Sequence, residues 1–196
     1  MSNSDNFIPK QQYWEKYYNI KKSLDTPSSF CNYITKNYDL RDFSITDICC
    51  GNGRDTFHLG TFCKNVIGID YANKPNDREN IKFVRSSIED YIAKNKNLIT
   101  YCRFGFHAFE ESIENIIIEN SKVLMLEFRS DKDTSFVNDH YRRLINGNKF
   151  ISKLLKTNYN IHYFKHGTNM AIYKQYNPMI IRVVASQLEF KFNENI

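Results

Sequence analysis

The residues best suited to do chemistry lie in one short stretch, DICCGNGRDT, residues 47–56. The chain has only 7 glycines in 196 residues, yet Gly51 and Gly53 are two positions apart here. They follow an apolar run and precede a segment that reads as a helix. Glycine is used where the backbone turns tightly or approaches a ligand closely. A strand that ends in such a turn and leads into a helix is typical of a site for a nucleotide-like cofactor.

An acidic residue after the next apolar run supports this interpretation. The run NVIGID ends at Asp70, and a carboxylate offers two acceptors to the two hydroxyl groups of a ribose. Ser87 and Ile88 follow the third apolar run, IKFV. In a doubly wound sheet these strand ends lie side by side at the carboxyl edge, where ligands bind. We expect cofactor contacts from Asp47, Cys49, Gly51, Asn52, Gly53, Asp70, Tyr71, Ser87, Ile88 and Arg103.

Two cofactors fit a glycine turn followed by an acid. A dinucleotide site is typically G-x-G-x-x-G, but the third glycine position here holds Thr56, which weakens the case for NAD. S-adenosylmethionine has no pyrophosphate, so the tight turn and the ribose acid are sufficient for it. The residues therefore favour S-adenosylmethionine.

The elements that must position these residues alternate along the chain. Strands are expected at 43–50, 65–70, 81–84, 98–102 and 122–128, and helices at 10–22, 27–38, 54–62, 86–94 and 110–120. A helix with a break near Gly147 is expected over 139–157, followed by strands at 160–167 and 179–186. Alternation predicts parallel βαβ units, whereas the short connection between the last two strands predicts an antiparallel pair. We expect an α/β fold with a seven-stranded, mostly parallel sheet and an antiparallel edge hairpin. Residues 1–40 would form a helical cap over the cofactor, and 41–196 the single domain.

Composition excludes several classes of protein. Hydrophobic residues make up 41% and charged residues 25%, which is typical of a globular chain, and the net charge of +5 does not demand a nucleic acid. The five cysteines have no CxxC spacing, so we expect neither a zinc site nor disulfides, and no metal. The polar N-terminus and the absence of an 18-residue apolar run predict a cytoplasmic protein without a membrane partner.

The motif DICCGNG resembles motif I of the class I methyltransferases, D-x-G-x-G-x-G, and VIGID resembles motif II. Cys49 stands where the first glycine usually is. The ordered blocks YWEKYY, PSSFC, YCRFGFHAF, LEFRSDKD, HYRR and NPMIIRV extend the resemblance over nearly the whole chain, to small bacterial methyltransferases of capsule and surface-carbohydrate pathways. Some of these are linked to the O-methyl phosphoramidate modification. The resemblance implies a Rossmann-like, S-adenosylmethionine-dependent enzyme that releases S-adenosylhomocysteine after methylating an oxygen of a sugar or phosphoramidate intermediate.

The same resemblance directs attention to the segment after the fourth strand, which faces the methyl group in that fold. We expect catalytic roles for Arg103, His107 and His140, and substrate contacts from Trp14, Tyr18, Arg129, Tyr141, Arg142 and Arg143. A sugar hydroxyl would need a histidine as general base, whereas an anionic oxygen would need only arginines to position it. In the structural alternative, Arg103 pairs with a core acid, His107 packs internally, and Trp14 and Tyr18 pack the N-terminal helix onto the core.

Two other functions stay open. One is methylation of a nucleic acid or a protein, although YCRFGFHAF lacks the NPPY-type sequence that holds a flipped base. The other is a non-catalytic module that binds the cofactor on the same fold. The main reason to consider it is Cys49, which replaces the usual first glycine of motif I.

Overall fold

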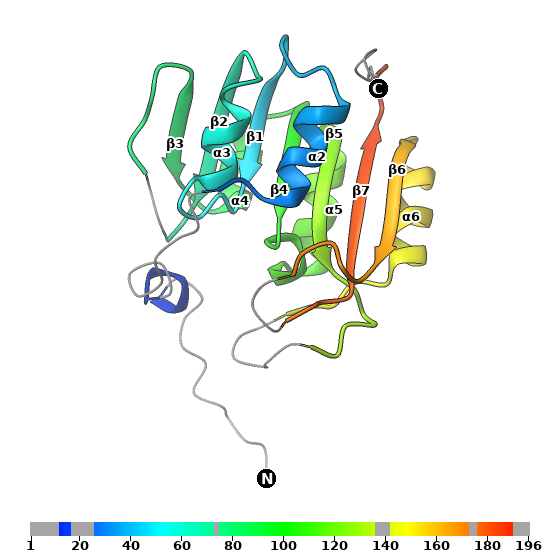
Figure 1. Cartoon of the computed structure of the whole chain (residues 1–196). Coiled ribbons are helices and arrows are strands. Elements are labelled where there is room, and N and C mark those ends of the chain that lie inside the picture. Colours follow the sequence, from blue (N-terminus) through cyan, green and yellow to red (C-terminus); the bar gives the residue numbers. More distant parts are fainter. Residues whose placement is uncertain (1–11, 17–25, 73–74, 136–141, 173–175, 190–196) are drawn as a thin grey trace.

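The computed structural model describes residues 12–16, 26–72, 75–135, 142–172 and 176–189. Seven strands form one sheet in the order β3-β2-β1-β4-β5-β7-β6 (Figure 1). The strands are β1 (Ser44–Ile48), β2 (Asn65–Asp70), β3 (Ile81–Arg85), β4 (Leu98–Arg103), β5 (Ser121–Arg129), β6 (Asn160–Gly167) and β7 (Ile180–Ser186). Strands β1 to β5 are parallel, and β7 runs antiparallel to both of its neighbours. The expected α/β fold with an antiparallel edge pair is therefore confirmed.

Helices cover both faces of the sheet. The helices are α2 (Ser29–Asn37), α3 (Arg54–Leu59), α4 (Ile88–Lys94), α5 (Glu111–Asn120) and α6 (Gly147–Lys156), with a 3₁₀ turn, η1 (Phe106–Ala108). Helices α2 and α3 contribute to one apolar cluster, and α4, α5 and α6 contribute to the other, on the opposite side of the sheet. Two separate cores therefore hold the strand ends in place, because each helix buries one apolar face against the sheet.

Strand β5 lies near the centre of the sheet and is buried along most of its length. Its residues Val123 to Leu126 are fully buried, as the unbroken apolar run in the sequence predicts for a strand covered on both faces. Phe128 continues into an aromatic cluster in which its ring centroid lies 5.1 Å from that of Phe150 and 5.5 Å from that of Phe106. This packing fixes the carboxyl ends of β4 and β5, where acceptor contacts were expected.

The helix expected over 139–157 begins later than predicted. Residues 142–146 are not helical, because Ile145 pairs with Ser130 in an isolated bridge and the Arg143 N–H donates to the carbonyl of His107 at 2.7 Å. Helix α6 starts after Asn146, whose side chain accepts the Lys149 N–H at 3.1 Å. Asparagine is a preferred residue at such a cap. Of the helix expected over 10–22, only 12–16 is described, and it is helical.

None of the helices in the described ranges has the length and apolar character that crossing a membrane requires.

Candidate active site

The turn after β1 has the backbone shape that its glycines suggested. Cys49, Gly51 and Gly53 all have positive φ, at 58°, 58° and 78°. Gly53 is the N-cap of α3, and a Cβ there would lie 2.7 Å from the ring of Phe83 on β3. Both the dihedral angle and the lack of space therefore require glycine at this position.

Asp70 joins the glycine turn to the end of β2. One carboxylate oxygen accepts the Gly51 N–H at 3.1 Å and the other accepts the Ala72 N–H at 2.8 Å. The side chain is buried, yet it lines a large cavity. A carboxylate has two acceptor oxygens, which suits the two hydroxyl groups of a ribose.

Asp47 and Thr56 form the floor beneath the turn. The Thr56 hydroxyl donates to Asp47 at 2.6 Å, and both residues are buried. Burial raises the pKa of Asp47 well above its usual range, while the hydrogen bond from Thr56 acts in the opposite direction. Thr56 occupies the position of the third glycine of a dinucleotide motif, and its contact with Asp47 shows what the threonine does there.

Cys49 is accommodated by the residue opposite it. A Cβ on Gly105 would lie 2.5 Å from the Cys49 Cβ and 2.7 Å from its Sγ, so the absence of a side chain at 105 makes room for the cysteine. The neighbouring Cys102 thiol and burial together raise the pKa of the Cys49 thiol well above its usual range. Cys49 is therefore a neutral wall residue.

A cavity of about 890 Å³ runs along the carboxyl edge of the sheet, across the switch point between β1 and β4. Of the expected cofactor residues, Asp47, Cys49, Asn52, Asp70, Tyr71, Ser87, Ile88 and Arg103 line it. Gly51 and Gly53 shape the turn beside it. In the described part of the chain no cluster of histidine, cysteine, aspartate and glutamate could hold a metal ion.

The residues expected near an acceptor are divided between the cavity and the protein interior. Trp14, Arg103 and Arg129 line the cavity. Arg129 also forms an ion pair with Asp133, and Arg103 forms one with Glu127. The ion pair of Arg103 matches the structural alternative for this residue without removing it from the cavity wall.

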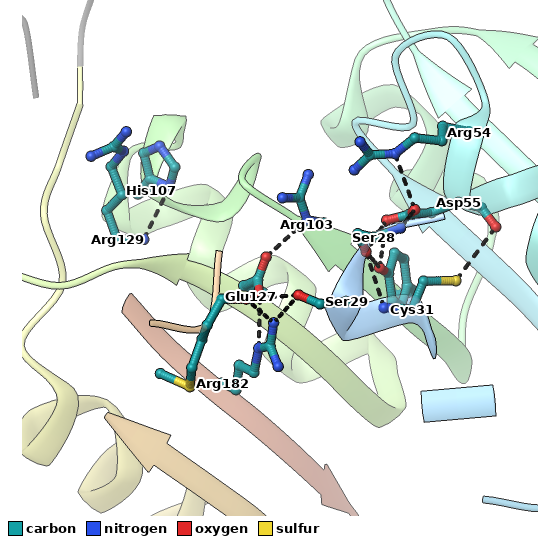
Figure 2. A network of polar contacts seen from close by, with 12 residues as sticks. Ser28, Ser29, Cys31, Arg54, Asp55, Arg103, His107, Glu127, Arg129 and Arg182 are labelled. Carbon is teal, nitrogen blue, oxygen red and sulfur yellow. Dashed lines mark hydrogen bonds and ion pairs between the residues drawn. The ribbon is translucent and has the colours of Figure 1, made fainter. Parts of the chain in front are cut away.

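His107 and Arg143 bind other parts of the protein. His107 is buried and is not among the described residues that line the cavity; its Nδ1 accepts the Arg129 N–H at 3.4 Å (Figure 2). Arg143 binds Glu114 on α5 and the carbonyl of Phe109, and neither it nor Arg142 is among the cavity-lining residues of the described ranges. Tyr18, His140 and Tyr141 lie outside the described residues.

A buried polar network that the sequence did not reveal closes the far wall of the cavity. Asp55 accepts hydrogen bonds from the Ser28 N–H and hydroxyl, both at 2.7 Å, and from the Tyr101 hydroxyl at 2.8 Å. Arg54 contacts the same carboxylate, with its Nε 3.3 Å from Oδ1. The only sequence signal was an acid directly after the glycine turn, which predicts a cap or a turn contact. Its actual partners come from α2 and β4.

Comparison with known proteins identifies the fold. No protein-family model matches the sequence, and neither does any curated protein. Among solved structures, an S-adenosylmethionine-dependent methyltransferase from Anabaena variabilis is 16% identical, with a TM-score of 0.61, covering 91% of this chain and 95% of that one.

Two further structures agree with this assignment. A putative S-adenosylmethionine-dependent methyltransferase from Listeria monocytogenes is 16% identical (TM-score 0.58, covering 82% of this chain and 98% of that one). A complex of the Haloferax volcanii Trm112 methyltransferase activator with a putative methyltransferase is 8% identical (TM-score 0.68, covering 91% and 96%). The chain therefore has the fold of these methyltransferases.

Proposed function

We propose that this protein is an S-adenosylmethionine-dependent methyltransferase. One observation carries the proposal: the carboxylate of Asp70 is tied to the Gly51 N–H and at the same time lines a cavity of about 890 Å³ at the sheet's switch point. This cofactor needs an acid for its ribose and a tight turn, and both are present. A dinucleotide site would have a third glycine at position 56, but this chain has Thr56, whose hydroxyl donates to Asp47.

The residues present fit this cofactor. Asp70 would hold the ribose, Tyr71, Ser87 and Ile88 would surround the base, and the 49–53 turn would pass along the middle of the cofactor. When bound, S-adenosylmethionine supplies a methyl group on a sulfonium. The protein's part in an in-line displacement is to hold the acceptor in line with that methyl group and to exclude water.

We infer that the acceptor is a small polar molecule methylated on oxygen, a sugar or phosphoramidate-type intermediate of a surface polysaccharide, and that the reaction is cytoplasmic. The acceptor part of this proposal rests on the resemblance noted above and on the arginines in the cavity wall. A general base must lie within hydrogen-bond reach of the acceptor. Of the two candidate bases, His140 lies outside the described residues, and His107 binds the Arg129 backbone and does not line the described cavity. The described residues therefore favour an acceptor oxygen that is already anionic.

The first experiment is a calorimetric titration of the purified protein with S-adenosylhomocysteine. We expect micromolar binding that is lost in Asp70→Ala, while Asp42→Ala, which removes an exposed carboxylate outside the cavity, binds like wild type. A folded wild type that does not bind the product would refute the proposal.

Acceptors are then screened with labelled S-adenosylmethionine against sugar phosphates and phosphoramidates. Transfer to RNA or to protein instead would favour methylation of a macromolecule. The Haloferax structure has the same fold and forms a complex with an activator protein. Tight binding without any transfer would favour the non-catalytic module.

A further inference from the structure

Two arginines from different elements face the cavity beside the same buried carboxylate. Arg54 is the first residue of α3, and Arg103 is the last residue of β4. Both line the cavity, and both lie within electrostatic reach of Asp55 (Figure 2). Their side chains are only 16% and 23% exposed, so neither is an ordinary solvated surface arginine.

Arg103 is held in place from behind. Its Nε donates to Glu127 at 2.8 Å, and the other oxygen of that fully buried carboxylate accepts from Arg182 at 2.6 Å. Arg182 is fixed in turn by the Ser29 hydroxyl and the Met170 carbonyl, both at 2.8 Å. Within the described ranges, the terminal nitrogens of Arg103 make no hydrogen bond to protein.

Arg54 is held in the same manner by Asp55. Its Nε contacts Asp55, whose two oxygens are further occupied by Ser28 and Tyr101. Its terminal nitrogens, too, have no hydrogen-bond partner among the residues described. Each guanidinium thus uses its inner nitrogen for positioning and presents the outer pair of N–H groups to the cavity.

The ion pairs of this cluster contain more guanidiniums than carboxylates. Three guanidiniums, those of Arg54, Arg103 and Arg182, form ion pairs with two carboxylates, Asp55 and Glu127. Burial acts to raise the pKa of Asp55, but Arg103, Arg54 and the hydrogen bonds from Ser28 together outweigh it, so its pKa lies below the usual value. The acid is therefore ionised at neutral pH. A partly desolvated guanidinium whose terminal N–H groups lack a partner is stabilised when an anion accepts from them.

We propose that Arg54 and Arg103 form an oxyanion-binding subsite at the α2 end of the cavity, which takes a carboxylate or a phosphate-type group. Planar guanidinium forks bind such groups through paired, charge-assisted hydrogen bonds. The proposed function enters only in naming where the oxyanion comes from. It is either the methionine carboxylate of the cofactor or an anionic group of the acceptor.

The test titrates wild type, Arg54→Gln and Arg103→Gln with three probes: S-adenosylhomocysteine, methylthioadenosine and inorganic phosphate. Methylthioadenosine keeps the ribose and adenine but lacks the amino-acid carboxylate. Arg41→Gln removes the same charge at an exposed residue that pairs with Asp39 outside the cavity, and it is the matched control. Phosphate is titrated into the protein alone and into protein saturated with each nucleoside in turn.

If the oxyanion is the cofactor's, both cavity variants bind S-adenosylhomocysteine about 10- to 100-fold more weakly and methylthioadenosine unchanged. If it is the acceptor's, both nucleosides bind as in wild type, and phosphate binds the wild-type complex with S-adenosylhomocysteine but not those of the variants. The proposal is overturned when neither variant differs from Arg41→Gln with any probe.

Failure of the proposed function gives a different pattern. Wild type would then bind neither nucleoside, while loss of phosphate binding in the two variants would still support the subsite. Thermal unfolding of each variant checks its fold. If a glutamine variant does not fold, Arg54→Lys and Arg103→Lys replace it: they keep the charge but not the paired N–H groups, and we expect them to lose at least part of the affinity.

Discussion

Gly105 leaves the space that the Cys49 side chain occupies. This contact allows a quantitative test of how the turn after β1 accommodates a cysteine where motif I usually has its first glycine. The perturbation is Gly105→Ala, made in wild type and in a Cys49→Gly background. Gly105 has φ −91° and ψ −35°, which alanine adopts without strain. Any cost of the alanine must therefore come from its contacts, the nearest of which is the Cys49 Cβ at 2.5 Å.

The magnitude follows from these distances. A methyl group forced against Cys49 Cβ and Sγ at 2.5 and 2.7 Å overpacks the site, which typically costs about 1–3 kcal/mol. Cys49→Gly alone should change stability little, because relief of roughly 1–2 kcal/mol of left-handed backbone strain offsets the loss of packing. In the Cys49→Gly background the two nearest contacts are gone and the next, with the Cys102 Sγ, is at 3.1 Å, so the alanine should cost at least about 1 kcal/mol less.

Urea unfolding followed by circular dichroism measures the four free energies of unfolding. Gly167→Ala is the control, because a Cβ there would meet nothing within 4 Å and should cost the same in both backgrounds. If the cost of Gly105→Ala were equal in the two backgrounds, within about 0.5 kcal/mol, the steric reasoning would be refuted.

Three further predictions concern the framework of the site. Thr56→Val leaves buried Asp47 without its donor, and we expect a loss of about 1–3 kcal/mol in urea unfolding, most of which Thr56→Ser should restore. Asp55 has a pKa below its usual value, so it stabilises the fold above about pH 4, and this contribution disappears as the pH falls through its lowered pKa. The difference in free energy of unfolding between wild type and Asp55→Asn should therefore shrink on acidification, and a difference independent of pH between 2 and 7 would contradict the lowered pKa. Asn146→Ala removes the cap of α6 and should cost about 1 kcal/mol, whereas an unchanged midpoint in urea would show that the cap contributes nothing.

Local patterns in the sequence were sufficient for the sheet and for the glycine turn and Asp70 at one end of the cavity. Alternating apolar runs predicted the strands and their parallel or antiparallel pairing, because the length of each connection limits how two strands can meet. Gly53 and Asp70 were recognisable because a tight turn and the end of a strand are short-range features. The place where α6 begins was missed, since it depends on the bridge between Ile145 and Ser130 from distant segments.

The far wall of the cavity was decided by tertiary structure alone. Asp55 meets Ser28 and Tyr101, 27 and 46 positions away, because α2 and β4 are packed against the start of α3. The register of β4 on β5 sets Arg103 beside Glu127, which also binds Arg182 on β7. Residue types predicted that arginines would gather at this edge of the sheet. Which of them faces the cavity and which faces a buried acid depends on the direction of each side chain, and packing between elements far apart in the sequence sets that direction.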